Sequence, residues 1–239
     1  MSASVATELP PPTDADADWT VATIQKDFVD WRRGRSRYAV WAIDLDLPGL
    51  CAASEQMRRH LDEYFLPQYA RQPHITLRIC GFSGPDRGFD DDYTPELFKS
   101  QIEFLERSRL QPFSLGIGRP GSFPSAAYFS VSDDDGGIAR VRQALADDGP
   151  GEKNFPYLPH VTFGLYRGRF PMAEVLRRMR SFPGPVTTQV TVGALVLMSY
   201  EAAVIGGPLT ACAEFDLERQ SWRVLDAKAM DGLLRPLSG

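Results

Sequence analysis

Apolar residues recur along this chain with two periods, one typical of strands and one typical of helices. Alternating or nearly continuous apolar runs bounded by turn residues predict strands at 37–47, 74–82, 113–117, 126–131, 160–166, 190–200 and 211–217. Apolar residues three or four positions apart predict amphipathic helices at 54–66, 95–105, 138–146 and 172–179. Thr94 is expected to cap the second helix, with Pro95 at its first position. This alternation of strands and helices favours an α+β fold.

The two ends of the chain differ in composition from its middle. Residues 1–18 are rich in Ser, Ala, Pro and Asp and have little to bury, which predicts a disordered tail. We expect one two-lobed domain at 19–230 and a short tail at 231–239. The reason is size, because 239 residues exceed a minimal domain but fall short of two large ones.

Charge and cysteine content narrow the class of function. A formal net charge of −5 argues against a protein that coats long nucleic acid, although a local basic cleft can still bind a short nucleotide or an RNA end. Cys51, Cys80 and Cys212 are widely spaced and show no metal-ligand spacing, which fits a reducing cytoplasm. The sequence shows no stretch of membrane-spanning length and no secretory signal. We therefore expect a cytoplasmic protein without a membrane partner.

The pattern Pro-His-x-Thr occurs twice, at 73–76 and 159–162, and takes two of the three histidines. In a strand, the His and Thr of each copy lie on one face while the residue between them lies on the apolar face. One copy is a common accident, but a second copy in similar surroundings indicates function. Two imidazoles and two hydroxyls facing one cleft would suit phosphoester chemistry without a metal. The sequence alone does not bring the two strands together.

Other patterns carry less weight. Residues 116–121 match G-x-G-x-x-G, but a strand rather than a helix is expected to follow, so they are interpreted as a turn and not as a dinucleotide site. The acidic runs 90–92 and 133–135 are interpreted as solvated loops rather than metal ligands. His60 is expected on the polar face of its helix. No metal and no cofactor are expected.

With these motifs the chain resembles the 2H phosphoesterase superfamily, which is named for its two His-x-Thr motifs. Within it the chain is most similar to the 2′-5′ RNA ligase-like, or RNA 2′,3′-cyclic phosphodiesterase, group. The resemblance covers about 37–217 and includes the segments 42–44, 121–124 and 197–199. It implies a two-lobed fold in which antiparallel sheets are flanked by helices and the motif strands line a central cleft.

The resemblance also implies roles for the motif residues. His74 and His160 would be the acid and base, and Thr76 and Thr162 would bind the phosphate. Which histidine is the acid stays open. In this family the expected product is the 2′-phosphate, which would make the 3′-oxygen the leaving group.

Three further residues are candidates for substrate binding. Counting in phase along each strand puts Arg78 on the face of the first motif, where it would pair with phosphate. The same count puts Tyr166 on the face of the second motif, where it would stack on a base, and Phe123 is a further stacking candidate. An ordinary surface or packing role competes for all three.

The leading interpretation is a monomeric, metal-independent phosphodiesterase that opens 2′,3′-cyclic phosphates at RNA ends or in small cyclic nucleotides. Ligation to a 2′-5′ linkage is the reverse of that reaction, with a ribose hydroxyl in place of water. One alternative is a nucleotide-binding module of the same fold with little or no catalysis. Another is a lipid- or tRNA-splicing-related phosphoesterase with a different leaving group. Turnover measurements and a panel of substrates separate these alternatives.

Overall fold

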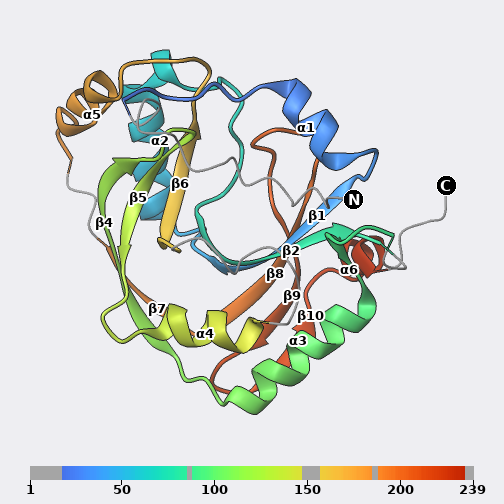
Figure 1. Cartoon of the computed structure of the whole chain (residues 1–239). Helices are drawn as coiled ribbons and strands as arrows, with labels where there is room; N and C mark the ends of the chain where they lie inside the picture. Colours follow the sequence, from blue (N-terminus) through green and yellow to red (C-terminus); the bar gives the residue numbers. More distant parts are fainter. Residues whose placement is uncertain (1–17, 85–87, 147–156, 185–187, 235–239) are drawn as a thin grey trace.

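The computed structural model describes residues 18–84, 88–146, 157–184 and 188–234, so the predicted N-terminal tail lies almost entirely outside the described residues. These residues form two sheets (Figure 1). The six-stranded sheet has the order β10-β9-β8-β1-β2-β3, and the four-stranded sheet has the order β6-β5-β4-β7. The strands, in chain order, are β1 (Arg37–Asp44), β2 (His74–Ser83), β3 (Asp92–Tyr93), β4 (Phe113–Ser122), β5 (Ala126–Ser132), β6 (His160–Leu165), β7 (Thr188–Val192), β8 (Ala194–Glu201), β9 (Thr210–Asp216) and β10 (Ser221–Val224).

Helices cover each sheet and define the two lobes (Figure 1). The described helices are α1 (Gln25–Arg32), α2 (Pro48–His60), α3 (Pro95–Ser108), α4 (Gly137–Leu145), α5 (Met172–Arg180) and α6 (Ala227–Leu234), with a 3₁₀ turn at Asp62–Tyr64. Helices α2 and α5 pack against the four-stranded sheet, whereas α4 and α6 pack against the six-stranded sheet. Helix α3 joins the second group, because Gln101 accepts a hydrogen bond from the indole of Trp41 on β1 at 2.8 Å. The predicted α+β fold with two lobes is confirmed.

Helices α2 and α4 each pack against the sheet that contains the other motif strand. Helix α2 lies between β1 and β2 in the sequence yet packs against β6, and α4 lies between β5 and β6 yet packs against β2. The segment that precedes each motif strand therefore crosses to the sheet of the other motif.

Local sequence explains where two of the helices begin. Thr94 caps α3, since its hydroxyl accepts a hydrogen bond from the backbone N–H of Leu97, and Pro95 is the first helical residue, as predicted. Helix α2 begins at Pro48, earlier than the predicted start at residue 54. Pro48 and Gly49, expected to form a turn after the strand at 37–47, instead begin this helix, because proline has no N–H to satisfy and its φ suits the first position.

One predicted strand is two strands in different sheets. The expected strand at 190–200 divides at Gly193, with β7 before it in the four-stranded sheet and β8 after it in the six-stranded sheet. The chain crosses between the lobes here, and the carbonyl of Gly193 accepts a hydrogen bond from Leu217 at 2.9 Å. The Gly-rich segment 116–121 is also corrected, because it lies inside β4 and not in a turn.

Elements at both ends of the described chain were not predicted. Helix α1 places Trp31 against the rings of Tyr38 and Phe82, with ring centroids 4.7 and 4.6 Å apart. Helix α6 continues to Leu234 and buries Leu233 completely, so the tail expected from residue 231 begins inside a helix. Among the residues that the structure describes, no helix has both the length and the apolar character needed to cross a bilayer.

The main hydrophobic core runs continuously through both lobes. Ile75 and Val161, the residues between His and Thr in the two motifs, are both fully buried in this core. Because side chains alternate along a strand, their burial directs the neighbouring histidines and threonines to the opposite face. The core therefore orients both motifs in the same way.

Candidate functional site

The two motif strands lie in contact with each other, although they belong to different sheets. On β2, Thr76 lies opposite Ala42 and His74 lies opposite Asp44. On β6, Thr162 lies opposite Tyr128. The sequence alone could not show whether the two motif strands meet. The fold brings both His-x-Thr segments onto neighbouring strands.

Both imidazoles are held by the same hydrogen bond. Nδ1 of His74 lies 2.8 Å from the carbonyl oxygen of Gln72, and Nδ1 of His160 lies 2.7 Å from that of Leu158. A carbonyl oxygen can only accept, so Nδ1 carries the proton in each ring. In the neutral ring Nε2 is then the basic atom. Neither Nε2 makes a hydrogen bond within the described part of the chain, so both remain available to a substrate.

Burial lowers the pKa of both histidines. The pKa of His74 falls to about 4, chiefly because the ring is desolvated; its hydrogen bond to Gln72 opposes the shift, and the charges of Arg71 and His160 add to it. The pKa of His160 is also lowered by burial, while its hydrogen bond to Leu158 opposes the change. The charge of His160 acts on His74, which places the two rings within electrostatic reach of each other.

The threonine hydroxyls of both motifs can act as hydrogen-bond donors. Thr76 and Thr162 are both partly exposed, and their hydroxyl groups make no hydrogen bond to another described residue. Each hydroxyl lies two residues after its histidine on the same strand face. The arrangement thus offers two ring nitrogens and two hydroxyl donors from two adjacent strands.

A β-bulge follows the threonine in both strands. On β2 the register moves from Thr76 opposite Ala42 to Arg78 opposite Trp41, which leaves Leu77 as the extra residue. On β6 the register moves from Thr162 to Gly164 between consecutive residues of β5. A bulge interrupts strict alternation, so counting in phase fails beyond the threonine.

Because of the bulges, the predictions that Arg78 and Tyr166 contact the substrate lose their basis in strand alternation. Arg78 lies opposite Trp41, out of phase with Thr76, so the count that placed it beside the first motif does not hold. Tyr166 is 0% exposed, and its hydroxyl hydrogen bonds with that of Ser122 at 2.5 Å. A ring with no exposed surface cannot stack on a base, so the expectation for Tyr166 is wrong.

Phe123 does lie beside the second motif. Its ring meets that of His160 edge to face, with centroids 4.9 Å apart, and Tyr128 also contacts His160 at 5.6 Å. Phe123 and Tyr128 are tilted against each other at 4.4 Å and both remain partly exposed. The two rings fix the orientation of the imidazole and leave an aromatic surface next to it.

Sequence reasoning missed Tyr128, and it missed two tyrosines that contact the motif backbones. Tyr157 donates to the carbonyl oxygen of Thr76 at 2.7 Å, and Tyr69 donates to that of Thr162 at 3.4 Å. An aromatic residue before each motif was visible in the sequence. Its target was not visible, because each tyrosine reaches the motif that it does not precede.

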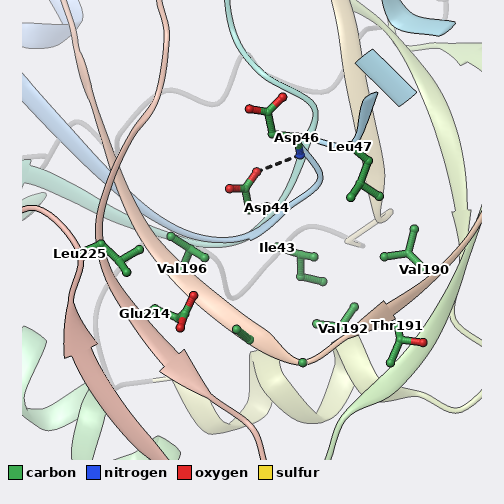
Figure 2. A pocket seen from close by; sticks show the side chains of 12 residues that line it. Ile43, Asp44, Asp46, Leu47, Val190, Thr191, Val192, Val196, Glu214 and Leu225 are labelled. Atoms are coloured by element: carbon green, nitrogen blue, oxygen red, sulfur yellow. Dashed lines mark hydrogen bonds between the residues drawn. The ribbon is translucent and has the colours of Figure 1, made fainter. Parts of the chain in front are cut away.

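A pocket of about 290 Å³ adjoins the first motif without including any motif residue. Asp44, which lies opposite His74 in the sheet, lines it together with Asp46 and Glu214, as Figure 2 shows. Burial raises the pKa of Asp44, and Glu214 is paired with Arg223 at 3.0 Å. Acidic walls disfavour an anion. A phosphate group is therefore better accommodated at the histidines and threonines than in this pocket.

Potential metal ligands are not gathered in the described part of the chain. No group of three or more His, Cys, Asp and Glu side chains there is arranged to hold a metal ion. The acidic runs serve structural contacts instead. Asp91 and Asp92 bind Arg35 at 2.6 and 2.7 Å, and Asp133 accepts hydrogen bonds from the first backbone N–H groups of α4.

The structure has two lobes of mixed α and β structure. Each lobe contributes one His-x-Thr strand, and the two strands meet where the lobes join, which is the arrangement of a two-histidine phosphoesterase fold. A family model described as the 2′-5′ RNA ligase superfamily matches residues 47–203, so the chain belongs to that superfamily. The resemblance to the 2H phosphoesterases is confirmed. Membership supports a function on phosphodiester bonds. A comparison with curated protein sequences found no match.

Solved structures with this fold are similar over most of their length. LigT of E. coli complexed with 3′-AMP is 18% identical with a TM-score of 0.50, and the match covers 76% of this chain and 98% of LigT. TT0787 of Thermus thermophilus is 20% identical with a TM-score of 0.52, and the match covers 75% and 97% of the two chains. A structure described as a phosphoesterase is 17% identical with a TM-score of 0.51, covering 75% and 98%. At these identities the likeness concerns the fold.

Proposed function

We propose that this protein is a phosphodiesterase that opens 2′,3′-cyclic phosphates at RNA ends or in small cyclic nucleotides. The observation that carries the proposal is the matched pair of imidazoles. Both rings are held through Nδ1, both present Nε2, and both have a partly exposed threonine hydroxyl on the same strand face. Such a set can move two protons and hold two phosphate oxygens at once.

The reaction needs one neutral and one protonated imidazole. The neutral Nε2 takes a proton from water as the water oxygen bonds to phosphorus. The protonated Nε2 gives its proton to the ribose oxygen as the P–O bond to that oxygen breaks. A 2′-phosphate and a free 3′-hydroxyl result when the 3′-oxygen leaves. Thr76 and Thr162 donate hydrogen bonds to the two non-bridging oxygens, where negative charge increases in the transition state.

The surroundings of the two rings favour different roles. The pKa of His74 falls to about 4, so this ring is neutral over a wide range and suits the base. His160 lies in a more exposed position and its pKa is lowered less strongly, so it suits the acid. A bound phosphate anion would raise the pKa of both rings and help to retain the proton on His160.

The proposed substrate class agrees with the wider setting of the site. LigT, which shares the fold, has been crystallised with 3′-AMP, a nucleotide. The partly exposed rings of Phe123 and Tyr128 beside His160 offer a surface on which a base would stack. All three cysteines are free thiols, which fits a cytoplasmic enzyme. We propose that it acts as a monomer, and that 2′-5′ ligation is the reverse reaction with a ribose hydroxyl in place of water.

The test is hydrolysis of a short RNA that ends in a 2′,3′-cyclic phosphate, measured in EDTA. We expect turnover without added metal, and a fall of about 10²- to 10⁴-fold in both His74→Ala and His160→Ala. His60→Ala is the matched control, because that imidazole instead contacts the carbonyl of Arg178 near the end of α5. Full activity in either motif variant, or activity only with added metal, would overturn the mechanism. If the intact protein binds mononucleotides without turnover, it is a nucleotide-binding module instead.

A further inference from the structure

Two tyrosines connect the motif strands in a reciprocal manner. Tyr157 comes three residues before the second motif histidine, yet its hydroxyl donates to the backbone of the first motif, at the carbonyl of Thr76. Tyr69 precedes the first motif, yet it donates to the backbone of the second motif, at the carbonyl of Thr162. Both acceptors belong to the residue immediately before a bulge. Bulges take backbone groups out of the regular ladder, so these carbonyls suit side-chain donors.

An arginine from the preceding helix packs on each tyrosine. The guanidinium of Arg142 on α4 lies 3.7 Å from the ring centroid of Tyr157, and Arg142 also donates to the carbonyl of Leu77 in the first bulge. The guanidinium of Arg58 on α2 lies 5.9 Å from the ring centroid of Tyr69. Since α4 packs against β2 and α2 against β6, each helix and the tyrosine that follows it contact the opposite motif strand. The same set of helix, arginine and tyrosine thus occurs at both motifs. Its distances are shorter at the first motif, where Tyr157 binds, than at the second, where Tyr69 binds.

Among the described strands, no backbone ladder sets the distance between β2 and β6. Strand β6 is an edge strand of its sheet, and β2 pairs with β3 only at Phe82 and Ser83, beyond the motif. The two motif strands nonetheless contact each other. Backbone hydrogen bonds do join Leu66 to Leu165 and Arg167 to Tyr64, but these lie beyond the motifs. At the motifs themselves, the contacts that link the two strands include the two tyrosine hydroxyls, which bind directly at the threonines.

We propose that Tyr69 and Tyr157 are positioning residues that set the separation of the two His-x-Thr segments. The proposal rests on the function proposed above, because only chemistry at a shared phosphate requires that separation. Catalysis by two groups on opposite sides of one phosphorus is sensitive to distance, and a misplacement of about 1 Å can cost about 10²-fold in rate. Neither tyrosine needs to touch the substrate to have this effect.

The experiment removes single hydroxyl groups and compares steady-state kinetics. In Tyr157→Phe we expect kcat for the cyclic phosphate to fall by about tenfold or more while KM changes little, because the misplaced groups act in the transition state. Tyr69→Phe should show a smaller loss, since its hydrogen bond is longer, at 3.4 Å compared with 2.7 Å. Tyr64→Phe is the control, because its hydroxyl bonds to Glu174 on α5 at 3.0 Å and touches neither motif. Equal losses in all three variants would assign the tyrosines a general structural role and overturn the proposal.

A second readout does not depend on turnover. NMR signals of the His74 and His160 rings are followed during titration with inorganic phosphate. In the intact protein one phosphate should shift both rings with a single Kd. In Tyr157→Phe this Kd should rise, or the two rings should respond separately, while Tyr64→Phe behaves like the intact protein. An unchanged joint response in Tyr157→Phe overturns the positioning role, whereas a joint response without turnover in the intact protein counts against the proposed function only.

Discussion

Replacing His74 by Asn tests whether this ring is buried in its neutral form. Asn keeps an N–H that can donate to the carbonyl of Gln72 but does not titrate. The pKa of His74 falls from 6.5 to about 4 on folding, mainly because only 7% of the residue is exposed. Between these values the unfolded chain binds a proton that the folded protein does not, so stability falls as the pH falls through this window and is retained above pH 6.5. A pKa lowered by this much corresponds to roughly 3 kcal/mol.

The assay is urea unfolding at pH steps from about 4 to 8, with the free energy of unfolding compared between variants. Carboxylates contribute to the pH dependence of every variant, so the informative quantity is the difference between the intact protein and His74→Asn. This difference should change by roughly 3 kcal/mol between about pH 7 and about pH 4, in the direction that favours the variant in acid. His60→Asn retains His74 and serves as the control. A difference that stays constant with pH would refute the buried, neutral state of His74.

Three other predictions concern catalysis, backbone and specificity. The pH profile of kcat/KM should be bell-shaped with its optimum between about 4 and 6.5, because His74 must be neutral and His160 protonated in the free enzyme; an optimum above about pH 7 would contradict these roles. Gly81→Ala should destabilise the fold by about 1–3 kcal/mol in thermal unfolding, because φ is +115° and a Cβ would lie 2.2 Å from a backbone oxygen, whereas Gly193→Ala meets nothing within 4 Å and should be nearly neutral. Phe123→Leu should raise KM for a nucleoside cyclic phosphate more than it weakens the affinity for inorganic phosphate, as measured by kinetics and NMR titration, because only the nucleoside has a base to stack.

The positions and buried faces of the two motif strands could be predicted from the sequence. Alternation placed Ile75 and Val161 in the core and the motif histidines on the other face, and the structure has the two middle residues fully buried. Helix α3 began where its cap and proline predicted. These features are local, since each depends on residues within a few positions of one another.

Features that depend on contacts between distant segments could not be predicted. The bulges after Thr76 and Thr162 appear only in the pairing with β1 and β5, and they break the count that placed Arg78 and Tyr166 on the motif faces. Gly193 looks like any small residue within an apolar run, yet the chain changes sheets there. Likewise, the hydrogen-bond partners of Tyr157 and Tyr69 lie 81 and 93 residues away along the chain.

The two copies of the motif share their chemistry and differ in their surroundings. Each imidazole is fixed by the same bond from Nδ1 to the carbonyl two residues earlier, so both present Nε2. His74 is nearly completely buried, and the charge of Arg71 helps to lower its pKa. His160 lies on an edge strand beside aromatic rings and is more exposed. Two groups of equal pKa would share one proton without preference, but unequal burial selects one singly protonated state over a range of pH. In the proposed reaction the repeated motif supplies the pair, and the difference in burial supplies the direction of proton transfer.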